Sequence, residues 1–175
     1  MPAGHAFIGL INPKTPSNVG TIMRASGCYG VEKVFYTGQR YNYARQFVTD
    51  TQDVHERIPL LWVENIQAAV ESGMRLVAVE LAEGATPLPE YQHPENALYI
   101  FGPEDSSVPQ EVLNLCQDVV YIPTIGCMNL AATVNVLLYD RMAKSAAYDT
   151  STALIRRSRD AKNNLIVGKH AGKTE

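Results

Sequence analysis

The first candidate for chemistry in this chain is Arg24, which lies in the stretch INPKTPSNVGTIMRASGCYG at positions 11–30. The pattern predicts a helix over residues 17–29, with polar residues suited to capping at its start. At helical spacing the neighbours of Arg24 are small, and they include Gly20 and Gly27. Each glycine costs a helix about 1 kcal/mol relative to alanine, which favours a role that needs close approach to the arginine. An arginine in a structural ion pair, or one that snorkels at the sheet edge, fits the pattern equally well.

A second candidate is Glu104 in the stretch FGPEDSSVP, residues 101–109. The two serines can cap the helix that follows, and Asp105 favours its positive end. These local roles do not explain Glu104, which comes two residues after the strand-end Gly102. A cation such as Arg24 would be a suitable partner for it.

A third stretch, IPTIGCMNLAATVN at residues 122–135, leaves a predicted strand, turns through Gly126 and opens a helix near Asn129. Asparagine is a common N-cap, which is the simplest interpretation of Asn129. The chain carries neither GxGxxG nor GxxxxGK[ST]. It therefore gives little support to a dinucleotide site and none to a phosphate-binding loop of the Walker type.

Short apolar runs that alternate with helical patterns must position these residues. We predict an α/β fold with a mostly parallel sheet and helices on both faces. In such sheets ligands bind at the carboxyl ends of the strands, where the three stretches above would meet. Pro59 places its strand at an edge of the sheet. Strands are predicted at 6–11, 33–38, 57–63, 74–81, 96–102 and 118–123, and helices at 17–29, 64–73, 108–116 and 128–148.

Composition limits the classes of protein. The chain has 175 residues, of which 46% are hydrophobic, and no apolar run approaches the roughly 18 residues that span a membrane. The start of the sequence does not resemble a secretory signal, so we expect a cytoplasmic protein. Its three cysteines are widely spaced and its four histidines show no ligand spacing. These patterns predict reduced thiols and no metal site.

Charge is distributed unevenly along the chain. Residues 1–50 have five Lys/Arg and two Asp/Glu, a net charge of +3. Residues 51–150 have four against fourteen, a net charge of −10. Residues 151–175 have six against two, a net charge of +4. Basic ends are compatible with a polyanionic partner and equally with a solvated tail. We expect one domain over residues 1–150, followed by a basic, partly disordered tail at 151–175.

Taken together and in order, the three stretches resemble the SpoU (TrmH-like) branch of the SPOUT RNA methyltransferases. The first family motif has asparagine, then asparagine-x-glycine, then arginine, matched here by Asn12, Asn18, Gly20 and Arg24. The second is a glycine-x-glutamate turn, matched by GPE at 102–104. The third is isoleucine-proline, then serine-x-asparagine and a helix. The resemblance covers roughly residues 5–148.

The resemblance implies a C-terminal deep trefoil knot, a homodimer and S-adenosylmethionine as the cofactor. The homodimer would have the last long helix and the Arg24 helix close to its interface. The cofactor would be held by three loops near residues 79–84, 101–104 and 122–130. Within them the implied cofactor-binding residues are Val79, Leu81, Gly84, Phe101, Gly102, Ile122, Cys127 and Leu130.

The implied reaction transfers a methyl group to a ribose 2′-oxygen of tRNA or rRNA, with tRNA slightly favoured by a compact domain. Arg24 matches the catalytic arginine, whose guanidinium stays protonated and can stabilise negative charge on the attacking oxygen. Glu104 would orient Arg24, and Asn129 would position a loop or the substrate. Candidate RNA contacts are Asn12, Lys14, Asn18, Arg24, Arg40, Arg45 and the basic tail, with Tyr41, Tyr43 or Phe47 either stacking on bases or packing in the core.

Two features depart from the family pattern. Cys127 stands where serine is usual, and the loop over residues 123–129 is shorter than in many relatives. These departures leave open a non-catalytic RNA-binding module on the same scaffold. A third alternative, a small-molecule α/β enzyme, would suit the acidic middle of the chain.

Overall fold

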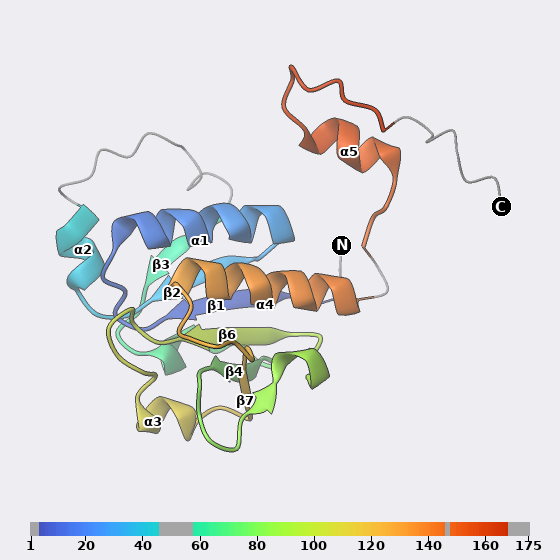
Figure 1. Cartoon of the computed structure of the whole chain (residues 1–175). Helices are drawn as coiled ribbons and strands as arrows, with labels where there is room; N and C mark the ends of the chain where they lie inside the picture. The colour runs from blue at the N-terminus through green and yellow to red at the C-terminus, as the bar shows by residue number, and fades with distance from the viewer. Residues whose placement is uncertain (1–3, 46–57, 146–147, 168–175) are drawn as a thin grey trace.

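The centre of the molecule is a seven-stranded sheet in which every pairing is parallel (Figure 1). The computed structural model describes residues 4–45, 58–145 and 148–167. The strand order is β3-β2-β1-β6-β4-β7-β5. This sheet confirms the predicted α/β class. The strands are β1 Ala6–Leu10, β2 Lys33–Tyr36, β3 Leu60–Trp62, β4 Arg75–Val79, β5 Thr86–Pro87, β6 Ala97–Phe101 and β7 Asp118–Tyr121.

Helices cover both faces of the sheet, as predicted (Figure 1). The helices α1 (Pro16–Tyr29) and α4 (Leu130–Lys144) pack side by side on one face. The short helix α3 (Gln110–Leu113) and the 3-10 turn η2 (Ile66–Ala69) pack on the other. Three further elements are α2 Arg40–Arg45, η3 Leu88–Glu90 and α5 Thr152–Ser158.

The apolar faces of α1 and α4 fix these helices on the sheet. Ile22 and Met23 of α1 and Leu137 of α4 are fully buried, together with the central strand residues beneath them. Full burial of such a side chain stabilises the fold by about 2 kcal/mol. Since each helix directly follows a parallel strand, both begin at the carboxyl edge of the sheet. The first turns of α1 and α4 therefore lie at the carboxyl edge of the sheet, where the sequence predicted a ligand site.

Several elements differ from their predicted bounds. The predicted helix 64–73 is only η2, because the chain leaves helical geometry at Val70 and turns at Gly73 with φ +80°. The predicted helix 108–116 is only the four residues of α3. A short strand, β5, lies between the predicted strands 74–81 and 96–102, where no strand was predicted. The edge position of β3 is confirmed by the strand order.

The C-terminal part of the described chain contains α5, which lies apart from the α/β body in Figure 1. The division at residue 150, the partial disorder of the tail and the trefoil knot stay predictions. No helix in the described ranges is both long and apolar enough to cross a membrane.

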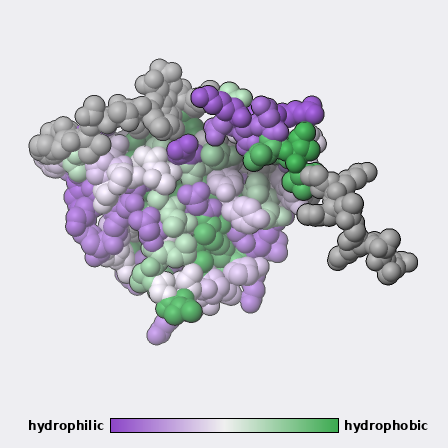
Figure 2. Space-filling model, turned by 45° about the horizontal axis from the view of Figure 1, so that its top comes forward, coloured by the Kyte–Doolittle hydropathy of each residue, from purple (hydrophilic) through white to green (hydrophobic). Residues whose placement is uncertain are grey.

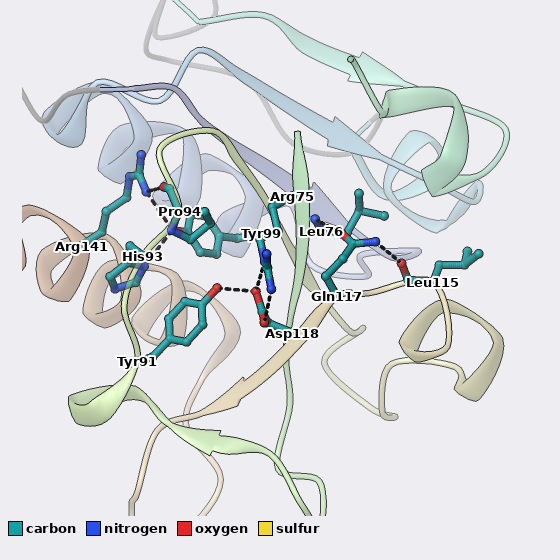
Figure 3. A network of polar contacts seen from close by, with 10 residues as sticks. All are labelled: Arg75, Leu76, Tyr91, His93, Pro94, Tyr99, Leu115, Gln117, Asp118 and Arg141. Atoms are coloured by element: carbon teal, nitrogen blue, oxygen red, sulfur yellow. Dashed lines mark hydrogen bonds and ion pairs between the residues drawn. The ribbon is translucent and has the colours of Figure 1, made fainter. Parts of the chain in front are cut away.

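A polar network joins the second half of α4 to β6 and to the loop after η3 (Figure 3). His93 lies at its centre, with Nδ1 2.7 Å from the Tyr99 hydroxyl and Nε2 2.8 Å from the Asp140 carboxylate. The buried guanidinium of Arg141 donates to Tyr99 and to the carbonyl oxygens of Pro94 and Glu95. The network compensates the burial of this cation, which would otherwise be strongly destabilising.

Burial lowers the pKa of His93, and the nearby cations Arg141 and Lys144 act in the same direction, although the hydrogen bond to Asp140 opposes them. A histidine with a lowered pKa binds its proton more readily in the unfolded chain. The free energy of unfolding should therefore fall as the pH drops below about 6.5, the ordinary histidine value.

We predict that His93→Gln makes the free energy of unfolding less dependent on pH between 8 and 5.5, because the titrating group is gone. Urea unfolding of wild type and variant across this range measures the difference. His5→Gln is the matched control, since His5 lies at the surface beside Glu32. An unchanged pH dependence in the His93 variant would contradict the assignment.

Candidate functional site

A cavity of about 540 Å³ lies at the carboxyl ends of β4, β6 and β7. Its walls are the ends of these strands and parts of the segments that follow, within residues 79–81, 101–107 and 121–130, completed by Asn18 of α1 and Thr133 of α4. A cavity of this size lies within the range that binds small molecules and cofactors. The fold therefore places the three stretches singled out in the sequence around one space.

Most of the residues expected to bind a cofactor line this cavity. Gly84 does not: it turns with φ +83° in the loop beyond β4, and open space surrounds it. The seven that line the cavity are Val79, Leu81, Phe101, Gly102, Ile122, Cys127 and Leu130.

A chain of hydrogen bonds connects the three stretches at the mouth of the cavity. The carboxylate of Glu104 accepts the backbone N–H groups of Lys14 at 2.8 Å and Thr15 at 2.9 Å, and the side-chain amide of Asn18 at 3.1 Å. The oxygen of the Asn18 amide in turn accepts from Asn129 Nδ2 at 3.0 Å. We call this Glu104–Asn18–Asn129 arrangement the polar chain.

The polar chain places Asn129 and Glu104 at the starts of α4 and α1, where unpaired backbone N–H groups need hydrogen-bond acceptors or negative charge. Asn129 is the N-cap of α4, as predicted, and its Oδ1 accepts the N–H groups of Ala131 and Ala132. Its Nδ2 is thereby left to reach Asn18. α1 begins at Pro16, after Thr15, whose side chain makes no capping bond. The carboxylate of Glu104 supplies negative charge at that helix start instead.

The polar chain also sets the ionisation of Glu104. Partial burial alone would raise the pKa of its carboxyl group, but the hydrogen bonds from Lys14, Asn18 and Thr15 outweigh this and lower it. The group is therefore anionic at neutral pH. An anionic carboxylate accepts stronger hydrogen bonds than a neutral one, which favours the arrangement.

The structure does not place Arg24 beside Glu104, so the expected orienting contact is absent. Instead, the carboxylate of Glu104 accepts three hydrogen bonds, two from the loop before α1 and one from Asn18. Arg24 is exposed on α1, and among the described residues no hydrogen bond or ion pair to it is found. Its catalytic role stays a prediction.

Sequence reasoning missed Glu80, the residue directly after β4. Its carboxylate accepts the N–H of Leu81 at 2.9 Å and the N–H of Val108 at 2.8 Å, which ties the end of β4 to the loop after β6. At Gly102 a Cβ atom would lie only 2.9 Å from the nitrogen of Val108, so glycine is required there. The position of Glu80 at a strand end was the available signal.

Two of the basic residues expected to contact RNA, Lys14 and Arg40, lie beside the cavity. Arg40 at the start of α2 and the side chain of Lys14 both contact Asp105. The guanidinium of Arg45 lies 5.6 Å from the ring centre of Tyr41. Lys14 and Arg40 thus bring positive charge to one rim of the site.

The remaining candidates have mixed surroundings. Tyr41 is buried and packs edge-on against Tyr36, whereas Tyr43 is exposed. Phe47 lies outside the described residues. Asn12 forms a tight turn with φ +41°, and its N–H donates to Thr37 Oγ1. Within the described ranges no group of three or more His, Cys, Asp or Glu could hold a metal ion.

Comparison with known proteins gives the family. The model of the SpoU rRNA Methylase family matches residues 5–139, about three quarters of the chain. The chain belongs to the SpoU rRNA methylase family. The polar chain and the cavity both fall within the matched region, so the site described above is part of the family domain.

Individual relatives are more distant. An uncharacterized tRNA/rRNA methyltransferase of Synechocystis is 27% identical over 164 residues, which cover 85% of this chain and 58% of that protein. The chain thus spans less than two thirds of the length of this relative. A protein solved for insight into 2-OH methylation of C/U34 on tRNA has a TM-score of 0.64 at 24% identity, covering 79% of this chain and 95% of its own. An AdoMet-bound rRNA methyltransferase of Sinorhizobium meliloti has a TM-score of 0.63 at 20% identity, with coverages of 81% and 57%.

We predict that Asn18→Ala and Asn129→Ala each lower the free energy of unfolding by about 1 kcal/mol, since each removes side-chain hydrogen bonds of the polar chain. Urea unfolding measures both. The double variant should lose less than the sum, because the two side chains bond each other. Ser17→Ala, an exposed neighbour on α1, serves as the control. Strict additivity of the two losses would argue against the chain.

Proposed function

We propose that this protein transfers the methyl group of S-adenosylmethionine to a ribose 2′-oxygen of tRNA or rRNA. The observation that carries the proposal is the cavity closed by three loops and joined by the polar chain, in a member of the SpoU rRNA methylase family. The relatives support the substrate class and the cofactor, since they include a tRNA/rRNA methyltransferase, a protein solved for insight into 2-OH methylation on tRNA and an AdoMet-bound rRNA methyltransferase.

The cavity fits S-adenosylmethionine in its chemistry. Leu81, Ile122 and Leu130 supply apolar surface for an adenine ring, above the buried Val79 and Phe101. The close approach at Gly102 leaves a backbone cradle that a side chain would fill. We assign cofactor binding to these residues together with Cys127. When bound, S-adenosylmethionine supplies an electrophilic methyl group.

Arg24 is the proposed catalytic residue. Its guanidinium is exposed and stays protonated, so it binds an RNA phosphate and stabilises negative charge that develops on the 2′-oxygen. A protonated guanidinium does not accept the hydroxyl proton, which leaves to the adjacent phosphate or to water. Glu104 and Asn129 act as positioning residues, since they fix the loops that surround the cavity.

We also propose that the protein is a homodimer, paired through the outer faces of α1 and α4. The outer stripe of α4 consists of Ala132, Val136, Tyr139 and Ala143, all exposed. On the outer side of α1 the exposed Arg24 lies near Gly20, where a Cβ atom would meet nothing within 4 Å. Figure 2, in which the top of the view of Figure 1 comes forward, shows hydrophobic and hydrophilic residues interspersed on the visible face. Small and apolar helix faces of this kind pack closely against a second copy.

Such a dimer would give Arg24 surroundings that one chain lacks. The arginine lies on the outer stripe of α1, away from the residues that line the cavity of its own chain. Pairing across α1 and α4 would place it beside residues of a second copy. The dimer is therefore part of the proposed catalytic arrangement.

We predict that the pure protein binds S-adenosylmethionine and S-adenosylhomocysteine at about one site per chain, measured by calorimetry. Gly102→Ala should weaken binding, because its Cβ atom would displace the loop at Val108. Gly27→Ala is the matched control, since Gly27 lies on α1 outside the cavity lining and a Cβ atom there would make only an ordinary contact, 3.9 Å from Ile58 Cδ1. Arg24→Ala should retain cofactor binding and lose methyl transfer to RNA by about 100-fold or more.

Other outcomes of these measurements have definite meanings. Full methyl transfer by the Arg24 variant would remove this arginine from the mechanism. Salt-sensitive RNA binding by wild type, without cofactor binding or methyl transfer, would favour a non-catalytic RNA-binding module. Cofactor binding without any RNA affinity would favour a small-molecule enzyme.

We predict that Tyr139→Glu converts the dimer to monomers, because it buries a charge at the proposed interface. Sedimentation velocity measures the change. Tyr43→Glu introduces the same charge at an exposed tyrosine of α2 and should leave the dimer intact. A wild-type protein that sediments as a monomer at micromolar concentration would refute the dimer.

A further inference from the structure

Three charged side chains meet at the rim of the cavity. Asp105 receives two parallel hydrogen bonds from Arg40, each 2.9 Å long, one to each carboxylate oxygen. Lys14 Nζ lies 3.5 Å from Asp105 Oδ2. The three residues come from different segments: the turn after β6, the start of α2 and the loop before α1. Asp105 also lines the cavity, so the cluster adjoins the site.

This cluster has two positive side chains, Lys14 and Arg40, and one negative side chain, Asp105. One carboxylate serves two cations, and Arg45 lies further along α2. The side chains of Lys14, Arg40 and Asp105 are 60%, 32% and 48% exposed. Ion pairs this exposed contribute little to stability, so a competing anion can replace the carboxylate. A phosphate is the natural competitor, because it accepts the same two-pronged arginine geometry.

A second arginine–carboxylate pair, Arg75 with Asp118, has a less exposed carboxylate than the Asp105 cluster and serves as a comparison for an ion pair with a structural role. Arg75 contacts Asp118 through two nitrogens, and the Tyr91 hydroxyl donates to the same carboxylate (Figure 3). The Asp118 side chain is only 22% exposed, and the pair lies at the amino-terminal ends of β4 and β7, away from the cavity. Asp105 has no such third neutral partner among the described residues and is open to exchange.

We propose that Arg40 and Lys14 form a binding site for a backbone phosphate of RNA, and that Asp105 occupies this site until RNA displaces it. The proposal rests on the proposed function, since it assigns a contact to the RNA substrate. The backbone N–H of Lys14 is bound by Glu104, so the phosphate site is fixed to the same turn as the polar chain. A phosphate held there would set the register of the RNA strand at the cavity mouth.

The test measures binding of a 20-nucleotide oligouridine and of bulk tRNA by filter binding over a range of salt. Asp105→Asn should tighten binding by up to about fivefold, the factor associated with breaking one exposed ion pair. Arg40→Ala should weaken binding and make the logarithmic salt dependence shallower by about 0.7, the contribution of one phosphate contact on a single strand. In the Arg40→Ala background, Asp105→Asn should give a smaller gain, because only Lys14 remains to be released.

Glu71→Gln is the matched control, because it removes one negative charge from another exposed ion pair, with Lys33. An equal gain from this variant, or a full gain from Asp105→Asn without Arg40, would show general charge repulsion and overturn the proposal. Absence of oligouridine and tRNA binding by wild type would also overturn it. Methyl transfer is scored separately. RNA binding that follows the predicted pattern without methyl transfer would retain the phosphate site and reject the enzyme.

Discussion

The site depends on one constraint, which is that three loops distant in sequence must keep a fixed separation at one edge of the sheet. Parallel pairing of β1, β6 and β7 with their neighbours brings the loops to that edge, but it does not fix their mutual positions. The polar chain does so. Its links join residues 86 and 111 positions apart, and its central acceptor is the anionic Glu104. Since hydrogen bonds to a charged group are stronger than neutral ones, this chain can offset the entropy lost when the loops are ordered.

The helix α4 is held by polar contacts at both ends and by apolar contacts between them. Asn129 fixes its first turn to Asn18, and Arg141 fixes its last turns to the carbonyl oxygens of the loop before β6. The inner stripe of Val134, Leu137 and Leu138 is buried on the sheet. This leaves the outer apolar stripe of α4 without a role in the single chain, which is why it is available to the proposed dimer. Fold and assembly thus use different sides of the same helix.

The sequence was most informative where one periodic pattern acts over many residues. The apolar runs predicted the parallel sheet, and the spacing of apolar residues predicted α1 and α4. Short elements such as η2 and α3 were predicted too long, because the chain leaves helical geometry at Val70 and continues after α3 only in tighter turns, up to Cys116. Of the site, the sequence predicted most of the cavity wall, since it lies at strand ends. The partners of Glu104 and Glu80 depend on how neighbouring loops meet in space, and no spacing along the chain encodes that.

The adjacent residues Glu104 and Asp105 illustrate a difference that matters for function. Glu104 is bound by neutral donors, namely two backbone N–H groups and one amide, whereas Asp105 is bound by two cations. An RNA phosphate cannot take the neutral donors from Glu104 without breaking the start of α1, but it can take Arg40 and Lys14 from Asp105 at little cost. One turn thus carries a permanent carboxylate that builds the site and an exchangeable one that, in our proposal, yields its cations to the substrate. Had Glu104 been bound by Arg24, the proposed catalytic cation would have been neutralised by the residue that holds the loops together.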